Sequence, residues 1–222
     1  MKVLLFWSSG KDSAWALYRL RKARMPVGAL LMVTTPDQRV PYHSVPVSYV
    51  RLQAIAANLP LWVVPLPFPC PNAIYETVIH TTLLQARQQG FSHVAFGDLY
   101  LEDIRAYREK LVRAAGLEPL FPIWTGGKRA SMRLARKLLR RGVRAVVTAV
   151  DPNRLPGFQV PVAYDYLWLR SLPKGIDPCG EQGEFHTFCY EGPMFYRPIS
   201  LPEALHVPFR RVASACARRA LL

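Results

Sequence analysis

The first twenty residues constrain the fold most, because an apolar strand, a polar loop and a helix follow one another without interruption. Residues 2–7 (KVLLFW) are predicted to form a buried strand, and residues 14–20 (AWALYRL) a helix. Residues 8–13 (SSGKDS) therefore connect a strand end to a helix start. Free backbone N–H groups and the positive end of the helix dipole meet at that point, so the loop predicts an anion-binding site.

Residues 8–13, called the anion loop below, contain the side chains that a phosphate site needs. The loop consists of Ser8, Ser9, Gly10, Lys11, Asp12 and Ser13. Its hydroxyls are donors, its lysine is a point charge, and its glycine permits close approach or a positive φ. Asp12 would repel phosphate, so we assign it to helix capping or to a divalent cation that bridges to the phosphates. A serine-rich helix cap is the alternative, although a cap does not need the lysine, glycine and aspartate together.

After the anion loop, apolar strands alternate with helices, which predicts a doubly wound parallel α/β sheet. The expected strands are residues 27–33, 61–66, 92–96 and 143–150, and the expected helices are residues 47–58, 72–89 and 128–141. A short strand and turn at residues 116–125 is a candidate boundary. We therefore expect a larger domain over residues 1–124 and a smaller one over residues 125–222.

The composition indicates a basic protein with a real core. Half of the 222 residues are hydrophobic, and 29 Lys and Arg against 15 Asp and Glu give a net charge of +14. This excess favours polyanions such as tRNA, an acidic protein surface or nucleotides, but base composition or stability explains it equally well. No apolar run approaches the roughly 20 residues of a membrane span, and no signal peptide precedes the first strand, so we expect a cytoplasmic protein without a membrane partner. The four cysteines lack the spacing of a zinc site and are expected to be free thiols.

Residues 97–109 (GDLYLEDIRAYRE), called the Gly97 segment, combine acids and arginines directly after a predicted strand. Carboxylates past a strand end hold Mg²⁺ through water or receive an amine, while arginine matches phosphate or carboxylate. We interpret the segment as a loop that carries Asp98, Glu102, Asp103, Arg105 and Arg108. Because Glu102, Arg105 and Glu109 are also helical neighbours, a solvated, salt-bridged helix face is the alternative.

Residues 175–188 (GIDPCGEQGEFHTF), called the acidic segment, are too dense in glycine and acids for a core element. The glycines indicate a loop that brings backbone against a ligand, with a strand following from Phe185. Glu181, Glu184 and His186 can act as bases, hold an ammonium ion or bind metal. Cys179 has no evident base partner and is expected to be a packed thiol rather than a nucleophile. A plain glycine-rich turn is the alternative.

We also make predictions for His43 and for the helix at residues 128–141. His43 lies in a proline-bearing loop and is expected to be exposed to solvent, with a substrate contact as the alternative. The helix at residues 128–141 has an apolar stripe and an arginine stripe. The apolar stripe comprises Met132, Ala135 and Leu139, and the arginine stripe Arg129, Arg133, Arg136 and Arg140. We expect the arginine stripe to be a solvated face, with contact to a phosphate backbone as the alternative.

The three motifs together resemble a known group of enzymes. The anion loop resembles that of the PP-loop ATP pyrophosphatase superfamily, usually Ser-Gly-Gly-x-Asp-Ser, with Ser9 at a position that is commonly glycine. The sequences GDLYLEDIR at residues 97–105 and DPCGEQGEFHT at residues 177–187 resemble the diphthine–ammonia ligase family and its bacterial relatives within that superfamily. This resemblance spans residues 8–188 in the expected order. It implies a Rossmann-like, adenine nucleotide alpha hydrolase-like ATP-binding domain followed by a smaller substrate-binding domain.

The resemblance implies an ATP-dependent ligase that releases AMP and pyrophosphate. A carboxylate would attack the α phosphorus of ATP, Lys11 and the helix start would stabilise the developing charge, and ammonia would then displace AMP. In eukaryotic and archaeal members the carboxylate belongs to diphthine on elongation factor 2, whereas a bacterial member would act on another carboxylate. A PP-loop ligase that modifies tRNA and a non-catalytic ATP-binding sensor are the alternatives.

Site residues and partners follow from the three motifs. The expected catalytic residues are Lys11, Asp12, Asp98, Glu102 and Glu184. The expected ATP contacts are Ser8, Ser9, Gly10, Lys11, Asp12 and Ser13, with Asp12 also binding Mg²⁺. The expected substrate contacts are Gly97, Asp98, Tyr100, Glu102, Asp103, Arg105, Gly180, Glu181, Gly183, Glu184 and His186. The expected partners are ATP, Mg²⁺, ammonia and elongation factor 2, with tRNA as an alternative, and the sequence leaves the oligomeric state open, a homodimer included.

Overall fold

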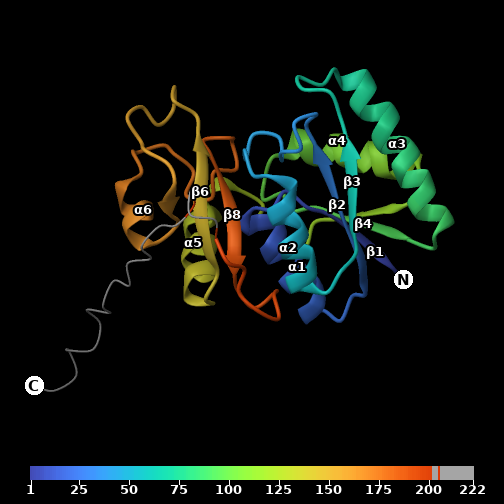
Figure 1. Cartoon of the computed structure of the whole chain (residues 1–222), viewed down its shortest axis with the longest axis horizontal. Coiled ribbons are helices and arrows are strands. Elements are labelled where there is room, and N and C mark those ends of the chain that lie inside the picture. Colours follow the sequence, from blue (N-terminus) through green and yellow to red (C-terminus); the bar gives the residue numbers. More distant parts are fainter. Residues whose placement is uncertain (202–204, 206–222) are drawn as a thin grey trace, which may run out of the picture.

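Five parallel strands form the larger sheet, in the order β3-β2-β1-β4-β5 (Figure 1). The computed structural model describes residues 1–201 and Leu205. The strands are β1 (Val3–Phe6), β2 (Val27–Thr34), β3 (Leu61–Pro65), β4 (His93–Ala95) and β5 (Glu118–Leu120). The chain winds outward from β1 to β3 and then returns to place β4 and β5 on the other side, which is the predicted doubly wound α/β fold. Ligands of such sheets bind where the winding reverses, here between β1 and β4.

Helices cover both faces of this sheet, and its strands are therefore apolar on both sides. The helices are α1 (Lys11–Lys22), α2 (Val47–Ala57), α3 (Asn72–Gln88) and α4 (Glu102–Ala114). Leu4 and Leu31 lie in one core cluster with residues of α3 and α4. Their neighbours Leu5 and Leu30 lie in the other cluster, with residues of α1 and α2. Burial on both faces is typical of parallel sheets.

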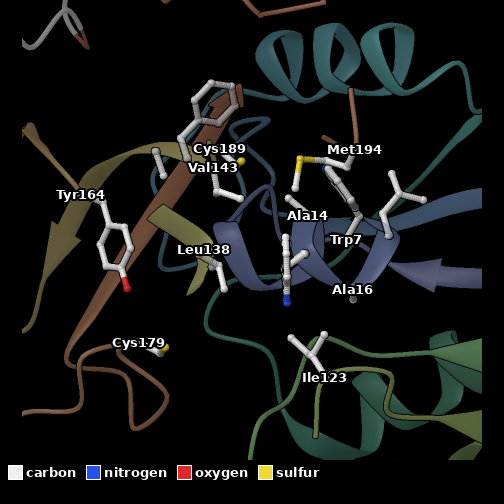
Figure 2. Packing of buried hydrophobic residues seen from close by; sticks show 14 of the residues in the cluster. Trp7, Ala14, Ala16, Ile123, Leu138, Val143, Tyr164, Cys179, Cys189 and Met194 are labelled. Carbon is white, nitrogen blue, oxygen red and sulfur yellow. The ribbon is translucent and has the colours of Figure 1, made fainter. Parts of the chain in front are cut away.

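A second, three-stranded antiparallel sheet follows, in the order β7-β6-β8. Its strands are β6 (Arg144–Val150), β7 (Val162–Ala163) and β8 (Phe185–Glu191), and they are accompanied by the short 3₁₀ helix η1 (Lys128–Ala130), α5 (Ser131–Arg140) and α6 (Tyr166–Ser171). Figure 1 shows this sheet beside α1 and α2. One hydrophobic core cluster joins the two parts of the chain (Figure 2). It contains Ala14 of α1 from the first part, and Leu138 of α5, Val143 before β6 and Cys189 of β8 from the second. The division between residues 124 and 125 stays a prediction.

The Gly97 segment differs from the sequence-based expectation. It was predicted to be a loop over residues 97–109, but α4 begins at Glu102. The loop prediction was wrong there because the two acids that suggested a ligand site, Glu102 and Asp103, occupy the first turn of the helix, where the helix dipole favours negative charge. The alternative interpretation, a helix face with i,i+4 ion pairs, is confirmed by the pair between Arg105 and Glu109.

The helix expected at residues 128–141 also differs in detail. Its first turn is the 3₁₀ helix η1, and α5 proper begins at Ser131. Its buried apolar face consists of Leu134, Ala135 and Leu138, whereas Met132 and Leu139 flank this face and are only half-buried. The predicted apolar stripe was therefore displaced around the helix. Among the described helices, none is long and apolar enough to cross a membrane.

Candidate active site

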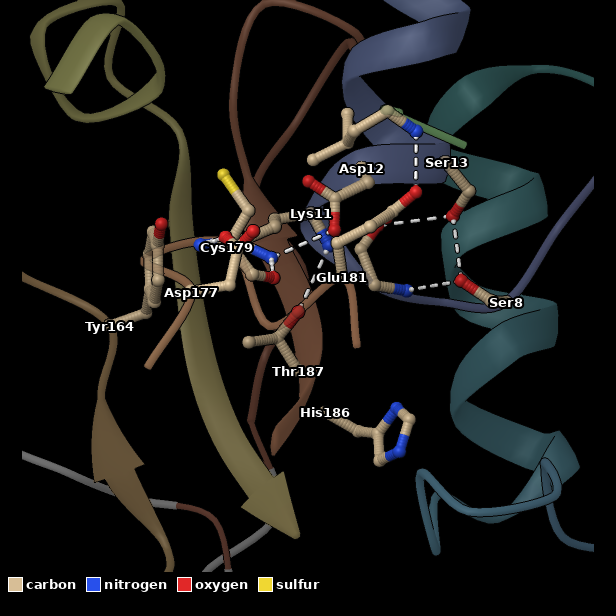
Figure 3. Close-up of polar contacts among 12 residues, drawn as sticks. Ser8, Lys11, Asp12, Ser13, Tyr164, Asp177, Cys179, Glu181, His186 and Thr187 are labelled. Carbon is tan, nitrogen blue, oxygen red and sulfur yellow. Dashed lines mark hydrogen bonds and ion pairs between the residues drawn. The ribbon is translucent and has the colours of Figure 1, made fainter. Parts of the chain in front are cut away.

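A cavity of about 370 Å³ lies where the anion loop, the start of the Gly97 segment and the acidic segment meet. All residues of the anion loop except Ser9 line it, and the Gly97 segment contributes Gly97 and Asp98. The acidic segment contributes Gly180, Glu181, Gly183 and His186 to the lining. Figure 3 shows the residues of the anion loop and of the acidic segment approaching one another. Three motifs that are distant in sequence thus share one cavity at the carboxyl ends of the parallel strands, as expected for this fold.

The remaining predicted site residues do not line this cavity. Ser9 and Glu184 are fully buried beneath it, and the hydroxyl of Tyr100 donates to Asp177. Glu102 and Asp103 are exposed in the first turn of α4. Arg105 bonds Glu109 (Nε–Oε1 2.8 Å), and its guanidinium stacks on Trp124, 4.9 Å from the ring centroid.

Ser9 occupies a left-handed backbone conformation, with φ of 67°. Its carbonyl oxygen accepts hydrogen bonds from the amide of Cys189 (2.9 Å) and from Nε2 of Gln53 (2.9 Å). Its own hydroxyl is buried and has no hydrogen-bond partner in the described part of the chain. A non-glycine residue in this left-handed region is strained, so glycine would fit this backbone position better than serine.

Gln53 supports the anion loop from below, and the sequence analysis missed it. Its Nε2 also donates to the carbonyl oxygen of Cys189 (2.7 Å), and its Oε1 accepts from Nε1 of Trp7 (2.7 Å). The side chain is fully buried, and each of these bonds satisfies a polar group that would otherwise be costly to bury. The available signal was a single amide side chain on the buried side of a largely apolar helix.

Lys11 and Asp12 form a buried ion pair at the start of α1 (Nζ–Oδ2 2.8 Å). Nζ of Lys11 also donates to the carbonyl oxygen of Cys179 (2.5 Å), so the ammonium joins the anion loop to the acidic segment (Figure 3). Burial is the largest single influence and lowers the pKa of Lys11. The charge and hydrogen bond of Asp12, together with Cys179 and Asp177, outweigh burial, so the pKa is raised. Lys11 is therefore a permanent cation in this site.

Asp12 meets the requirement for a divalent cation. Its Oδ1 is buried and has no hydrogen-bond partner among the described residues, while Oδ2 is taken by Lys11. In the same described part, no three His, Cys, Asp or Glu side chains form a cluster that could hold a metal ion by themselves. Mg²⁺ is commonly bound by one or two carboxylates, with water and substrate phosphates as the other ligands. One free carboxylate oxygen fits that mode of binding.

Backbone contacts fix the start of α1 against both neighbouring motifs. The amide of Lys11 donates to Oγ1 of Thr187 (3.1 Å). A Cβ at Gly97 would lie 2.8 Å from the amide nitrogen of Ser13, which is too close for any side chain. The glycine of the second motif is therefore required by the close approach of the strand end to the helix start.

Arg108 is the arginine of the Gly97 segment that reaches the cavity. Its Nε forms an ion pair with Oδ2 of Asp98 (2.6 Å), and its guanidinium lies 4.5 Å from the ring centroid of Phe96. Arg105, which was predicted to contact substrate, points elsewhere. The start of α4 at Glu102 sets the helix phase, and only that phase distinguishes the two arginines.

Two acids of the acidic segment serve the segment itself. Asp177 is fully buried and accepts hydrogen bonds from the hydroxyls of Tyr100 and Ser131 and from the amide of Cys179 (2.7 Å). Glu184 is fully buried, and its two oxygens accept the amides of Asp177 (3.1 Å) and Gln182 (3.0 Å). These carboxylates therefore hold the loop in shape.

Glu181 is the carboxylate of the acidic segment that faces the cavity. Its Oε1 accepts the amide of Leu99 at 2.6 Å, a contact between residues 82 positions apart. Burial raises the pKa of Glu181 to about 8, with the nearby charges of Asp12 and Asp98 acting in the same direction. A carboxyl group with this pKa exchanges a proton near neutral pH, which is a property of catalytic acids and bases.

Two histidines line the cavity next to each other as neutral rings. Their ring centroids are 4.6 Å apart, and burial lowers the pKa of His43 to about 3 and that of His186 to about 4. Nδ1 of His43 lies 2.9 Å from the carbonyl oxygen of Thr187, which can only accept, so Nδ1 carries the proton. The expectation that His43 is a solvent-exposed loop residue was wrong, because the chain brings its loop against β8.

Cys179 behaves as a packed thiol, as predicted. It is buried, its Sγ contacts the carbonyl oxygen of Ser131 at 3.6 Å, and burial raises its pKa to about 12. A thiol with such a pKa is not a nucleophile at neutral pH. The acid–base groups of this cavity are therefore carboxylates and not thiolates.

Comparison with known proteins agrees with this arrangement. Residues 1–119, more than half of the chain, match the model of the diphthamide synthase N-terminal domain. The chain belongs to the diphthamide synthase family. The matched region contains the anion loop, the Gly97 segment and the whole five-stranded sheet except the last residue of β5.

Relatives extend the similarity of this diphthamide synthase family member to the acidic segment. The chain is 24% identical to the diphthine–ammonia ligases of Bos taurus and of Homo sapiens, in each case over 90% of this chain and 82% of the relative. A solved structure described as a predicted subunit of a tRNA methyltransferase from Methanocaldococcus jannaschii aligns with 61% of this chain and 74% of its own, at 20% identity and a TM-score of 0.37. That last likeness is too low to carry an argument.

Proposed function

We propose that this chain is an ATP-dependent amide ligase, which adenylates a substrate carboxylate and transfers ammonia to it with release of AMP and pyrophosphate. The observation that carries the proposal is the pairing of the anion loop with Glu181 across one cavity, since a phosphate site and a proton acceptor then serve the same bound molecule. Relatives named diphthine–ammonia ligase support the same chemistry. Diphthine on elongation factor 2 in the cytoplasm, or a related carboxylate, would be the acceptor.

ATP would lie with its phosphates on the anion loop and its base toward the apolar end of the cavity. Phe6, Leu31 and Val33 line that end, where β1 and β2 finish. The amides at the start of α1 and the cation of Lys11 would stabilise the charge that develops on the phosphates. Asp12, through its free Oδ1, would hold Mg²⁺, which neutralises phosphate charge when it is bound.

The acceptor and ammonia would enter from the side of Glu181 and the histidine pair. Arg108 beside Asp98 offers a guanidinium that could orient a carboxylate, although part of its donor fork is used by the ion pair. Glu181, with its pKa of about 8, would take a proton from a bound ammonium ion and so produce the ammonia that attacks. Asp177 and Glu184 would act only as positioning residues, because the oxygens of Asp177 accept from Tyr100, Ser131 and Cys179 and those of Glu184 accept backbone amides of the segment.

The reaction balances in two steps. An oxygen of the acceptor carboxylate attacks the α phosphorus, the bond to the bridging oxygen breaks, and pyrophosphate leaves with the electron pair. Ammonia then attacks the acyl carbon, the carbon–oxygen bond to AMP breaks, and one proton is lost to the base. Adenylation is needed because a free carboxylate is a poor acyl donor, whereas AMP is a good leaving group.

The direct test is to incubate the protein with ATP, Mg²⁺, ammonium and candidate acceptors, including elongation factor 2 that bears diphthine. The expected products are AMP, pyrophosphate and an acceptor whose OH has been replaced by NH₂. An acceptor carboxylate labelled with ¹⁸O should transfer one heavy oxygen to AMP, because the acyl carbon–oxygen bond is the one that breaks in the second step. Heavy oxygen in inorganic phosphate, with ADP as product, would contradict adenylation.

Two results would move the assignment elsewhere. ATP binding without pyrophosphate release for every acceptor offered would indicate a sensor. Pyrophosphate release that requires tRNA would indicate a ligase that modifies RNA. Asp103→Asn serves as the control throughout, because Asp103 is exposed and outside the cavity lining.

A further inference from the structure

The exposed side of η1 and α5 carries only one sign of charge. Seven cationic side chains, called the basic face, are exposed there: Lys128, Arg129, Arg133, Arg136, Lys137, Arg140 and Arg141. None of them forms an ion pair with another residue that the structure describes, although Nζ of Lys128 donates to the carbonyl oxygen of Gly175 (2.7 Å). No acid occurs in the sequence from Lys128 to Arg144. The basic face is therefore unneutralised.

Most of the described acids in the same part of the chain are buried, line the cavity or are paired. Residues 125–222 contain 16 Lys and Arg and 7 Asp and Glu, a net charge of +9. Asp165, Asp177 and Glu184 are buried, Glu181 faces the cavity, and Glu191 forms an ion pair with Arg144 (3.2 Å). Most of the described acids of this part are therefore buried or paired, whereas the cations of the basic face are exposed.

Comparison with α4 separates a binding surface from an ordinary solvated helix. α4 is also rich in charge, but Glu109 pairs with both Arg105 (2.8 Å) and Arg113 (3.2 Å) at i,i+4 spacing. Such mixed-sign pairs are typical of helix faces that meet only water. α5 has no such pair among the described residues, so its like charges repel one another unless an anion lies against them.

Spacing and chemistry identify the anion. Four arginines of the basic face (Arg129, Arg133, Arg136 and Arg140) follow one side of the helix at intervals of three or four residues, or about 4.5–6 Å at 1.5 Å per residue. A row of guanidinium groups suits a row of phosphates, which they bind in bidentate fashion. No large apolar side chain of η1 or α5 is exposed in the described structure, so an anchor for a protein partner is missing. The exposed side also has no Asn, Gln, Ser or Thr to read bases.

We propose that the basic face binds the phosphate backbone of a nucleic acid duplex without reading its sequence. The residues involved lie outside the cavity of the candidate active site, so this binding is separate from the proposed ligase chemistry. Binding of this kind is electrostatic and releases counterions from the duplex. Its affinity should therefore fall as the salt concentration rises.

The test compares two variants of the full chain that lose the same charge. One is Arg129→Ala, Arg133→Ala, Arg136→Ala and Arg140→Ala together. The control is Arg24→Ala, Arg51→Ala, Arg87→Ala and Lys110→Ala together, four exposed cations of the first part of the chain. Fluorescence anisotropy measures the Kd for labelled RNA and DNA duplexes at KCl concentrations between about 50 and 200 mM. Duplexes of about 20 base pairs are longer than the basic face.

The expected change is in the slope of the logarithm of affinity for B-DNA plotted against the logarithm of salt concentration. In the variant without the four arginines this slope should be smaller by about 3–4, because each lost phosphate contact removes about 0.9. The control should keep the wild-type slope, and duplexes of unrelated sequence should bind alike. Pyrophosphate release and circular dichroism should be unchanged in both variants. Equal losses in the two variants would overturn the proposal. Displacement of the duplex by polyglutamate as readily as by unlabelled duplex would overturn it in favour of an acidic protein partner.

Discussion

The anion loop and the acidic segment form opposite sides of one cavity, yet they use their charged groups differently. The anion loop leaves Oδ1 of Asp12 without a hydrogen-bond partner among residues 1–201 and Leu205. The acidic segment, in contrast, ties up Asp177 and Glu184 in hydrogen bonds to its own backbone and presents Glu181 to the cavity. A motif that is dense in acids is therefore not a dense array of catalytic acids. Most of its carboxylates accept hydrogen bonds from backbone amides that have no partner in a helix or strand.

The largest effect is expected for Asp12→Asn. Removing the charge of the free oxygen should lower the rate of pyrophosphate release by about 10²–10³-fold, the range found when one preorganised electrostatic contact is lost. The concentration of Mg²⁺ needed for half-maximal rate should rise. Steady-state assays measure both quantities, and Asp103→Asn should leave them at wild-type values. A wild-type rate and Mg²⁺ dependence in Asp12→Asn would remove the anion loop from the proposed mechanism.

Glu181→Gln should be nearly as harmful to the rate while leaving the fold intact. The amide oxygen of glutamine can still accept from Leu99, but it cannot take a proton, and general base catalysis typically contributes about 10²–10⁴-fold. The pH profile of the wild-type rate should rise with a midpoint near the pKa of about 8, and this midpoint should be absent from the variant. A variant whose rate keeps the wild-type midpoint near pH 8 would contradict the assignment. Partial rescue of the variant at high pH would agree with it, because free ammonia needs no base.

The same substitution changes how stability depends on pH. Glu181 has an ordinary pKa of 4.5, and burial raises it to about 8 in the folded protein. Its contribution to stability is therefore complete below pH 4.5 and is lost as the pH rises through 8. Thermal unfolding should show a smaller decrease in Tm between about pH 5 and about pH 9 in Glu181→Gln than in wild type. Parallel curves would contradict the raised pKa.

Glu184→Gln should lower the stability of the fold more than Glu181→Gln does, and lower the reaction rate less. Both oxygens of Glu184 accept backbone amides, and glutamine would place an NH₂ group against one of them. An unsatisfied buried donor costs about 1–3 kcal/mol, so the free energy of unfolding should fall by that amount in urea titrations. Activity at saturating substrate should fall less than in Glu181→Gln. Glu102→Gln, at an exposed position, is the control and should match wild type in both assays.

The smallest effect is expected in the anion loop backbone. Ser9→Gly removes a strained left-handed conformation worth about 1–2 kcal/mol, offset by about 0.4–1 kcal/mol of extra freedom in the unfolded chain. Ser9→Ala keeps the strain and removes the unpartnered hydroxyl. We expect the glycine variant to be the more stable of the two by about 0.5–1 kcal/mol in urea titrations. An alanine variant that is more stable than the glycine variant by about 0.4–1 kcal/mol would show that the conformation carries no strain.

The sequence predicted those parts of the molecule that local pattern determines. Alternating apolar runs and helices predicted the doubly wound sheet. The order of residues 8–13 predicted a loop between β1 and α1, but α1 already begins at Lys11, so residues 11–13 are helical. Which of Arg105 and Arg108 reaches the cavity depends on where α4 begins. Local composition did not predict that start, because it suggested a loop over the same residues. The bond from Leu99 to Glu181 joins residues 82 positions apart, and no local pattern encodes such a contact. Gln53 was missed for the same reason, since its partners lie on β8 and the anion loop.

The bond between the amide of Cys189 and the carbonyl oxygen of Ser9 has a consequence for biosynthesis. The anion loop precedes β8, the strand that completes its hydrogen bonds, by more than 170 residues, so it is synthesised before its partner. A growing chain can therefore form its parallel sheet early and still lack a finished loop until residues 185–191 have emerged. A chain that stops short of β8 would lack the hydrogen bond that holds the carbonyl oxygen of Ser9.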